Sequence, residues 1–290
     1  EFAASVSNAG GLGVIGTGAM NVEQAREAIR KCRSLTDKPF GVNVMMMNPY
    51  TKELMEMIAE EKVALVTTGA GNPGVYMKML KESGARVFPV VPSVAMAIRM
   101  ERSGADGLIV EGGEAGGHVG EQTTMALLPQ VVDAVHVPVV AAGGIADSRG
   151  FAAALCLGAI GVQVGTCLLV SEECPIHENY KNAVIKAKDT DTVVTGRSLN
   201  SPVRILKNPM SRQYIKLEAE AASRDELEKL TLGGLRRAVF EGDMKTGSVM
   251  MGQIAGLCKT IRPLKDILAS LVSDVPAVLA HAQQELEESR

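Results

Sequence analysis

Two pairs of small residues end two neighbouring apolar runs in the segment PVVAAGGIADSRGFAAALCLGAIGVQVGT. Gly143 and Gly144 end the first run, Gly165 and Thr166 end the second, and a helix-length spacer separates them. If both runs are parallel strands, the backbone N–H groups of their end loops and a helix N-terminus face one anion site. The pairing therefore predicts a phosphate cradle, although either pair alone is typical of any strand end in an α/β protein.

One histidine lies in a second glycine-rich segment, VEGGEAGGHVG, directly after another apolar run. His118 follows Gly116 and Gly117, whereas the other three histidines precede a strand, follow Cys-Pro or lie in the C-terminal tail. Imidazole titrates near neutral pH and transfers protons without a large pKa shift. A lone histidine is more often structural than catalytic; the placement suggests, as the functional alternative, a titratable group near a bound phosphorylated cofactor.

Four further positions combine polar or small residues with apolar runs. Asn43 lies inside GVNVMM, where a buried amide needs a partner, either a ligand or another core group. Thr68 and Gly69 begin the strand-end turn TTGAGNP, at the end of a strand where barrel active sites assemble, although Gly-Asn-Pro also forms ordinary turns. Glu111 ends GLIVEG and is either a carboxylate near the ligand or an ordinary strand-end carboxylate.

Short β-branched runs alternate with amphipathic stretches, which predicts a parallel sheet with helical crossovers. Strands are expected at 11–16, 40–46, 64–69, 86–91, 107–112, 138–143 and 161–166. Helices are expected between them at 21–35, 51–62, 75–84, 94–104, 123–135 and 148–158. A phosphate site at the last two strands is typical of a TIM-type (β/α)8 barrel, and we expect its first strand to precede residue 1. The alternative is an open, doubly wound sheet of seven strands.

The pattern changes after residue 170. We expect the barrel to occupy residues 1–170 and to continue to about residue 195, a capping segment to span 196–260, and a helical tail to span 261–290. In this part, helices are expected in 171–188, 225–243, around 248–259 and in 274–290, and an irregular, basic segment in 191–210.

Composition excludes several classes of protein. Tryptophan is absent, aromatic residues make up 3% and the net charge is −3, so the sequence offers no platform for nucleic acid. The five cysteines form no C-x-x-C pair, which argues against a zinc knuckle or a disulfide framework and favours a reducing cytoplasm. No apolar run approaches the roughly 20 residues of a membrane helix, so no membrane association is expected.

Segments along most of the chain carry a family resemblance. VSNAGGLGVIG, TTGAGNPGVYMKML, VEGGEAGGHVG, VVAAGGIADSRG, GVQVGT and GSVMMGQIAGL resemble, in order and spacing, the flavin-dependent enoyl-acyl-carrier-protein reductases of bacterial fatty-acid synthesis. The same wider family contains the nitronate monooxygenases, formerly called 2-nitropropane dioxygenases. The resemblance implies an FMN cofactor, NADH or NADPH as co-substrate and an enoyl thioester on acyl-carrier protein as substrate; some members also respond to a monovalent cation.

The resemblance also implies roles for the candidate residues. It places the FMN phosphate at the two small-residue pairs, Asn43 against the flavin ring and Glu111 near the ribityl chain. His118 would donate to the thioester oxygen or protonate the α-carbon. The full set of implied cofactor positions is Asn43, Thr68, Gly69, Glu111, Gly116, Gly117, Gly143, Gly144, Gly165 and Thr166.

Other functions stay open at this point. A nitronate monooxygenase would use the same histidine on a nitronate, with oxygen and without nicotinamide. A non-catalytic flavin- or phosphate-binding barrel is the third alternative. The outer helices of a barrel often pair, so a homodimer is expected. A basic stretch is either a docking face for acidic acyl-carrier protein or a solvated surface; it comprises Arg197, Arg204, Lys207, Arg212, Arg236 and Arg237.

Overall fold

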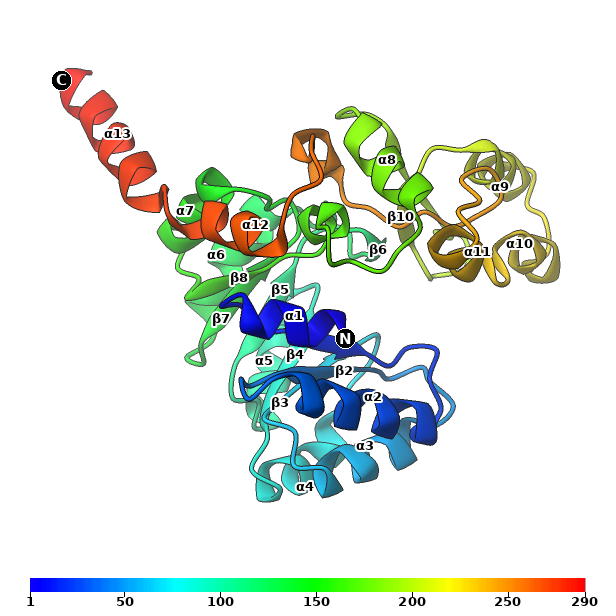
Figure 1. The fold of residues 1–290 in the computed structure, drawn as a ribbon, viewed down its shortest axis with the longest axis horizontal. Helices are drawn as coiled ribbons and strands as arrows, with labels where there is room; N and C mark the ends of the chain where they lie inside the picture. Colours follow the sequence, from blue (N-terminus) through cyan, green and yellow to red (C-terminus); the bar gives the residue numbers. More distant parts are fainter. Residues whose placement is uncertain (290) are drawn as a thin grey trace.

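The computed structural model describes residues 1–289, and its main feature is one curled sheet of seven parallel strands (Figure 1). The strand order β1-β2-β3-β4-β5-β7-β8 follows the chain. The strands are β1 (Val14–Gly16), β2 (Gly41–Met45), β3 (Leu65–Gly69), β4 (Arg86–Val91), β5 (Leu108–Glu111), β7 (Val139–Ala142) and β8 (Gly161–Gln163). Each lies within a predicted strand. Because a doubly wound sheet reverses its strand order, this order excludes that alternative and confirms the TIM-barrel-like fold.

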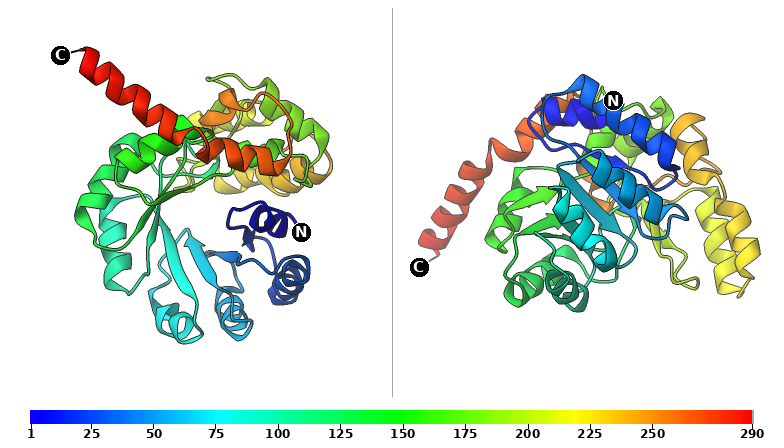
Figure 2. Two further views of the ribbon diagram at one scale, coloured as in Figure 1. Left: turned by 60° about the vertical axis from the view of Figure 1, so that its left-hand side comes forward. Right: turned by 90° about the horizontal axis from the view of Figure 1, so that it is seen from below.

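Helices cover the outer face of the curled sheet (Figure 2). They are α2 (Val22–Leu35), α3 (Thr51–Glu60), α4 (Met77–Glu82) after the 3-10 turn η1 (Gly74–Tyr76), α5 (Val94–Arg102), α6 (Thr124–Ala134) and α7 (Ser148–Cys156). Local sequence sets their ends: Asn21 forms a capping box with Gln24, and Asp147 accepts from the backbone of α7. Gly84 and Gly158 follow the helix ends at φ +92°, a conformation that favours glycine. The six predicted crossover helices are confirmed.

Strand alternation separates the core from the barrel interior. Val42 and Val44 are fully buried in the main apolar cluster beneath the helices, whereas Asn43 between them lines the interior cavity. In register, Asn43 lies beside Gly16 of β1 and Thr67 of β3. The parallel strands thus carry their inward side chains to a common interior.

Three helices lie near the edge strands β1 and β8. They are α1 (Phe2–Asn8), α12 (Leu264–Val272) and α13 (Val275–Glu288). The short helix α1 contacts α12, and both α12 and α13 contact α7. Beyond this contact α13 extends away from the body of the molecule (Figure 1). It confirms the helix expected in 274–290 over its described residues, since residue 290 lies outside them.

The prediction of an irregular segment over residues 191–210 is wrong, because this segment contains two strands. β9 (Thr192–Thr195) and β10 (Val203–Leu206) pair in antiparallel fashion, and β10 also pairs with β6 (Gly117–His118). Gly196 at φ +81° and Asn200 at φ +54° form the turn between β9 and β10. His118 therefore lies on a short strand of this second sheet rather than in a free loop.

Helices complete the cap around this small sheet. They are α8 (Glu178–Lys186), α9 (Pro209–Ala219), α10 (Arg224–Thr231) and α11 (Gly234–Phe240), with 3-10 turns η2 (Thr166–Val170) and η3 (Gln253–Leu257). The helices expected in 171–188 and around 248–259 are shorter than predicted, since the first begins only at Glu178 and the second is one 3-10 turn. Ile205, Met210, Tyr214 and Leu227 form a separate apolar cluster. The domain limits near residues 195 and 260 stay a prediction.

Candidate active site

A cavity of about 1320 Å³ occupies the barrel interior at the carboxyl ends of the strands and extends toward α1 and α12. It exceeds the roughly 300–1,000 Å³ of typical ligand pockets. The structure brings most predicted positions together on its wall, namely Asn43, Gly69, Glu111, Gly116, His118, Gly143, Gly144, Gly165 and Thr166. The carboxyl-end placement is where TIM-barrel enzymes build their sites.

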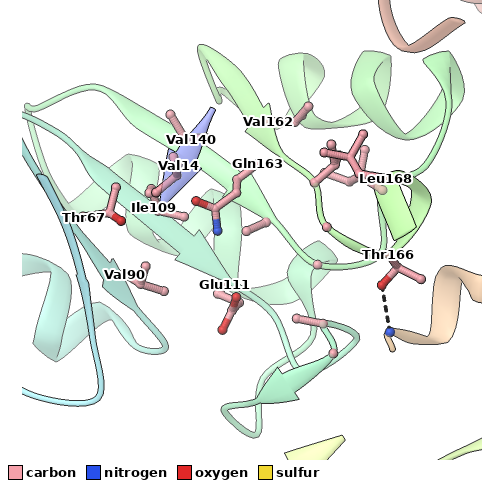
Figure 3. Close-up of a pocket in the computed structure, with 18 of the residues that line it drawn as sticks. Val14, Thr67, Val90, Ile109, Glu111, Val140, Val162, Gln163, Thr166 and Leu168 are labelled. Atoms are coloured by element: carbon pink, nitrogen blue, oxygen red, sulfur yellow. Dashed lines mark hydrogen bonds between the residues drawn. The ribbon is translucent and has the colours of Figure 1, made fainter. Parts of the chain in front are cut away.

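Both apolar and polar side chains line this cavity, among them Val140, Glu111 and Gln163 (Figure 3). Val14, Ile109 and Val140 come from three different strands and line its inner end. Glu111 ends β5 and Gln163 ends β8, and both line the cavity. Gln163 was missed in the sequence, although a polar residue within the apolar run GVQVG is the signal that identified Asn43.

The predicted phosphate cradle has room for a ligand. A Cβ added to Gly165 would meet no atom within 4 Å, and the same holds for Gly69. Thr166 begins η2 beside this space, and its Oγ1 accepts from the backbone N of Gly252 at 2.9 Å (Figure 3). Gly143 and Gly144 have φ of +89° and +76°. The open space of the cradle lies at Gly165, since a Cβ added to Gly143 would lie 2.9 Å from the Gly112 carbonyl oxygen; open backbone at a strand end fits a phosphate group.

Glu114, which sequence analysis missed, ties the histidine segment to the cradle. Its carboxylate accepts from the backbone N of Thr124 at 2.9 Å and from the Thr124 Oγ1 at 3.1 Å. The Thr124 hydroxyl also lies 2.9 Å from the carbonyl oxygen of Gly143. Glu114 thus holds the start of α6 and the loop that precedes β6 against the end of β7.

Arg204 connects the cap to the same loop. From β10 its Nε donates to the Gly113 carbonyl at 2.9 Å, and its Nη1 donates to the Thr192 hydroxyl at 3.1 Å. Burial lowers the pKa of this half-buried guanidinium. One member of the predicted basic stretch is therefore engaged in internal bonds that hold the segment leading to His118.

The neighbouring threonines of β3 point to opposite faces. Thr67 lines the cavity, and its hydroxyl donates to the Asn43 Oδ1 at 2.9 Å, which leaves the Nδ2 donors of Asn43 for a ligand. Thr68 is 1% exposed and lies in the wall toward the helices, where its Oγ1 has no hydrogen-bond partner among the described residues. Gly117 likewise lies outside the cavity lining, at φ +85° within β6.

Burial shifts the pKa values of two titratable side chains of the cavity, and both shifts favour the neutral form. It raises the pKa of Glu111 to about 7 and lowers the pKa of His118 below its ordinary value. The imidazole accepts and donates no hydrogen bond within residues 1–289, and its open surface lies at the cavity. Near neutral pH, His118 is consequently a neutral imidazole that can donate from one nitrogen.

Comparison with known proteins decides the family. The sequence pattern of the family described as nitronate monooxygenase matches residues 1–59 and 47–274. The chain belongs to the nitronate monooxygenase family. This family consists of flavin-dependent oxidoreductases, and the cavity with His118 lies where such a barrel binds its ligands.

Relatives within the nitronate monooxygenase family carry different activities in their names. A probable nitronate monooxygenase of Staphylococcus aureus is 31% identical and covers 97% of this chain and 92% of its own length. A (3aS,4S,5R,7aS)-5-hydroxy-7a-methyl-1-oxo-octahydro-1H-indene-4-carboxyl-CoA dehydrogenase of Mycobacterium tuberculosis is also 31% identical and covers 94% of this chain and 88% of its own length.

Similar proteins of known structure also differ in the activities that their names state. FabK of Thermotoga maritima, an enoyl-acyl-carrier-protein reductase II, is 47% identical with a TM-score of 0.95, covering 98% of this chain and 90% of its own. A nitroalkane oxidase of Streptomyces ansochromogenes is 25% identical with a TM-score of 0.86, covering 97% of this chain and 92% of its own. The predicted resemblance to this group of flavin enzymes is confirmed.

No helix within residues 1–289 combines the length and the apolar character needed to cross a membrane.

Proposed function

We propose that this protein is an FMN-dependent NAD(P)H enoyl-acyl-carrier-protein reductase that reduces trans-2-enoyl thioesters to acyl thioesters. The observation that carries the proposal is the 47% identity to FabK of Thermotoga maritima over 98% of this chain. Identity to the relatives named for nitronate or nitroalkane oxidation is lower, at 31% and 25%. The proposed place of action is the cytoplasm.

FMN fits the residues of the large cavity. The space beside Gly165 and the hydroxyl hydrogen of Thr166 suit its phosphate, and the free amide of Asn43 suits the polar edge of its ring. When bound, FMN supplies hydride transfer between a nicotinamide and an activated double bond. The protein supplies position, a largely apolar lining and the proton donor.

A neutral His118 can serve the second half of the reaction as a hydrogen-bond donor. Hydride addition to the β-carbon of an enoyl thioester places negative charge on the thioester oxygen, and an N–H donor at that oxygen stabilises the charge. Protonation of the α-carbon by the same residue would use the imidazolium form, with its extra proton taken up from solvent before the step. The cavity brings His118 to the same wall as the cradle, on a strand fixed by β10 and Arg204.

The test of the proposal is anaerobic NAD(P)H oxidation by the FMN-loaded protein with a trans-2-enoyl thioester, beside an aerobic assay with a nitronate. We expect rapid anaerobic oxidation that depends on the thioester. Turnover of nitronate with oxygen and without NAD(P)H, and none of the thioester, would contradict it.

Nitronate monooxygenase is the second candidate function. The family pattern and the Staphylococcus relatives favour it. Its chemistry would use the same histidine on the nitronate carbon, with oxygen and without nicotinamide, so the two assays above separate the candidates.

A further inference from the structure

A second cavity, of about 350 Å³, lies in the cap and is lined from the small sheet β6-β10-β9 and the helices α9 to α11. Its volume falls at the lower end of the range of about 300–1,000 Å³ found for ligand sites. It shares His118 and Met250 with the large cavity, so the two spaces adjoin at the imidazole. Exposed Asn200 and Arg224 lie on its outer rim. The cap cavity is therefore a second approach to His118 from the surface.

Two largely buried residues present hydroxyl groups to this cap cavity, and the hydroxyl oxygens are accessible from it. Tyr214 is 3% exposed and Ser248 is 6% exposed, and both line the cavity. Within residues 1–289 neither side-chain oxygen makes a hydrogen bond. Because both oxygens are accessible from the cavity and have no protein partner, each is available to donate to and accept from a polar occupant. Burial raises the pKa of Tyr214, which keeps its hydroxyl neutral and able both to donate and to accept.

The other side chains of the cavity wall indicate which kind of molecule fits the cap cavity. Apolar side chains of Leu199, Val203 and Ile205 alternate with the hydroxyls. Four side chains on the wall are charged or titratable, namely His118, Tyr214, Arg224 and Glu228. Arg224 and Glu228 form an exposed ion pair at 3.4 Å on the rim. A neutral chain with amides and methyl groups suits such a wall. A dinucleotide with two phosphates would be large for the volume and would meet one arginine.

We propose that the cap cavity binds the pantetheine arm of the thioester substrate. This inference rests on the proposed function for the identity of the substrate. The thioester lies at His118, the amides of the arm pair with the hydroxyls of Tyr214 and Ser248, and its distal phosphorylated end lies at Arg224. Substrate thus enters through the cap, while the large cavity holds the cofactor.

The experiment titrates the FMN-loaded protein calorimetrically with butyryl-pantetheine, a saturated thioester that cannot be reduced, and with butyryl-N-acetylcysteamine, which lacks most of the arm. Tyr214→Phe removes one hydroxyl and keeps the ring. We expect it to weaken butyryl-pantetheine binding about three- to tenfold and to leave the short thioester unchanged. Ser248→Ala should act in the same direction. Tyr50→Phe, at an exposed tyrosine outside both cavities, is the matched control and should change neither affinity.

The outcomes separate this inference from the proposed function. If wild-type protein reduces enoyl thioesters but binds butyryl-pantetheine no better than the short thioester, the inference is overturned and the function stands. If butyryl-pantetheine binds with the expected dependence on Tyr214 but enoyl thioesters are not reduced, the function fails and the arm site stands. A Tyr214→Phe protein with unchanged thioester affinities and a raised KM for NAD(P)H would assign the cap cavity to the nicotinamide and overturn the inference.

Discussion

Glu111 and His118 show how one environment favours the neutral form of an acid and of a base. Both lie at the large cavity, and burial disfavours charge on each of them. A raised carboxyl pKa and a lowered imidazole pKa are typical of functional sites, because such groups exchange protons near neutral pH. At the residue scale the site is therefore prepared for proton transfer by desolvation alone.

The raised pKa of Glu111 gives a stability prediction. The unfolded carboxyl ionises near 4.5 and the folded one near 7, so the folded state holds an extra proton between these values and stability falls as pH rises through this window. We expect Glu111→Gln to raise the free energy of unfolding by about 1–3 kcal/mol at pH 8 and by little at pH 5. Urea unfolding at both pH values measures this. Exposed Glu121→Gln controls for the lost charge; equal behaviour of the two variants would contradict the prediction.

The open space at Gly165 gives a binding prediction. Its backbone φ of −129° lies outside the left-handed region that favours glycine, and an added Cβ meets no protein atom within 4 Å. Gly165→Ala should therefore keep its melting temperature, while the methyl group takes space from the phosphate and weakens FMN binding by roughly tenfold or more. Gly161→Ala, equally unhindered but away from the cavity lining, is the control. Wild-type FMN affinity in Gly165→Ala would show that the cradle lies elsewhere.

At the scale of elements, the strand pair β6 and β10 joins the cap to the barrel. Val203 pairs with His118, and Arg204 beside it donates to the Gly113 carbonyl. Glu114 holds the other side of the same loop through Thr124. The position of the imidazole is thus set by contacts from both sheets rather than by the glycine loop itself.

Removing the guanidinium tests this connection. Arg204→Met keeps much of the apolar stem but leaves the Gly113 carbonyl and the Thr192 hydroxyl without a charged donor. We expect a loss of about 2 kcal/mol in the free energy of unfolding and a lower kcat with unchanged FMN affinity, because only the histidine strand loosens. Arg197→Met, at an exposed arginine near the same turn, should leave kcat unchanged. A kcat of Arg204→Met equal to that of the control would contradict this role.

The parallel strands could be predicted from the sequence, whereas the short strand β6 and the contacts around it could not. The seven parallel strands and their helices follow from apolar periodicity, because each run buries its side chains whatever lies around it. The strand β6 consists of Gly117 and His118 alone, so it has no periodicity and forms only against β10. Thr68 was chosen in place of Thr67 because the sequence does not fix which face of a buried strand points inward. Glu114 and Arg204 act through residues distant in sequence, and this left no local signal.

At the scale of the whole molecule, the cavity of the barrel-like domain and the cavity of the cap adjoin at His118 and Met250. The large cavity carries the cradle, the smaller one carries unpaired hydroxyls, and His118 lines both. The arrangement predicts that cofactor and substrate approach the imidazole from different sides. A residue in that position affects the proton-dependent half of the reaction and leaves the loading of the cofactor intact.

The most direct measurement follows the two half-reactions separately in wild type and His118→Ala, both loaded with FMN and mixed anaerobically first with NAD(P)H and then with a trans-2-enoyl thioester. We predict equal FMN content, equal rates of flavin reduction by NAD(P)H, and a loss of about a hundredfold or more in the rate of the thioester step. A thioester step as fast as that of the wild type would contradict the assignment of His118 as the proton donor.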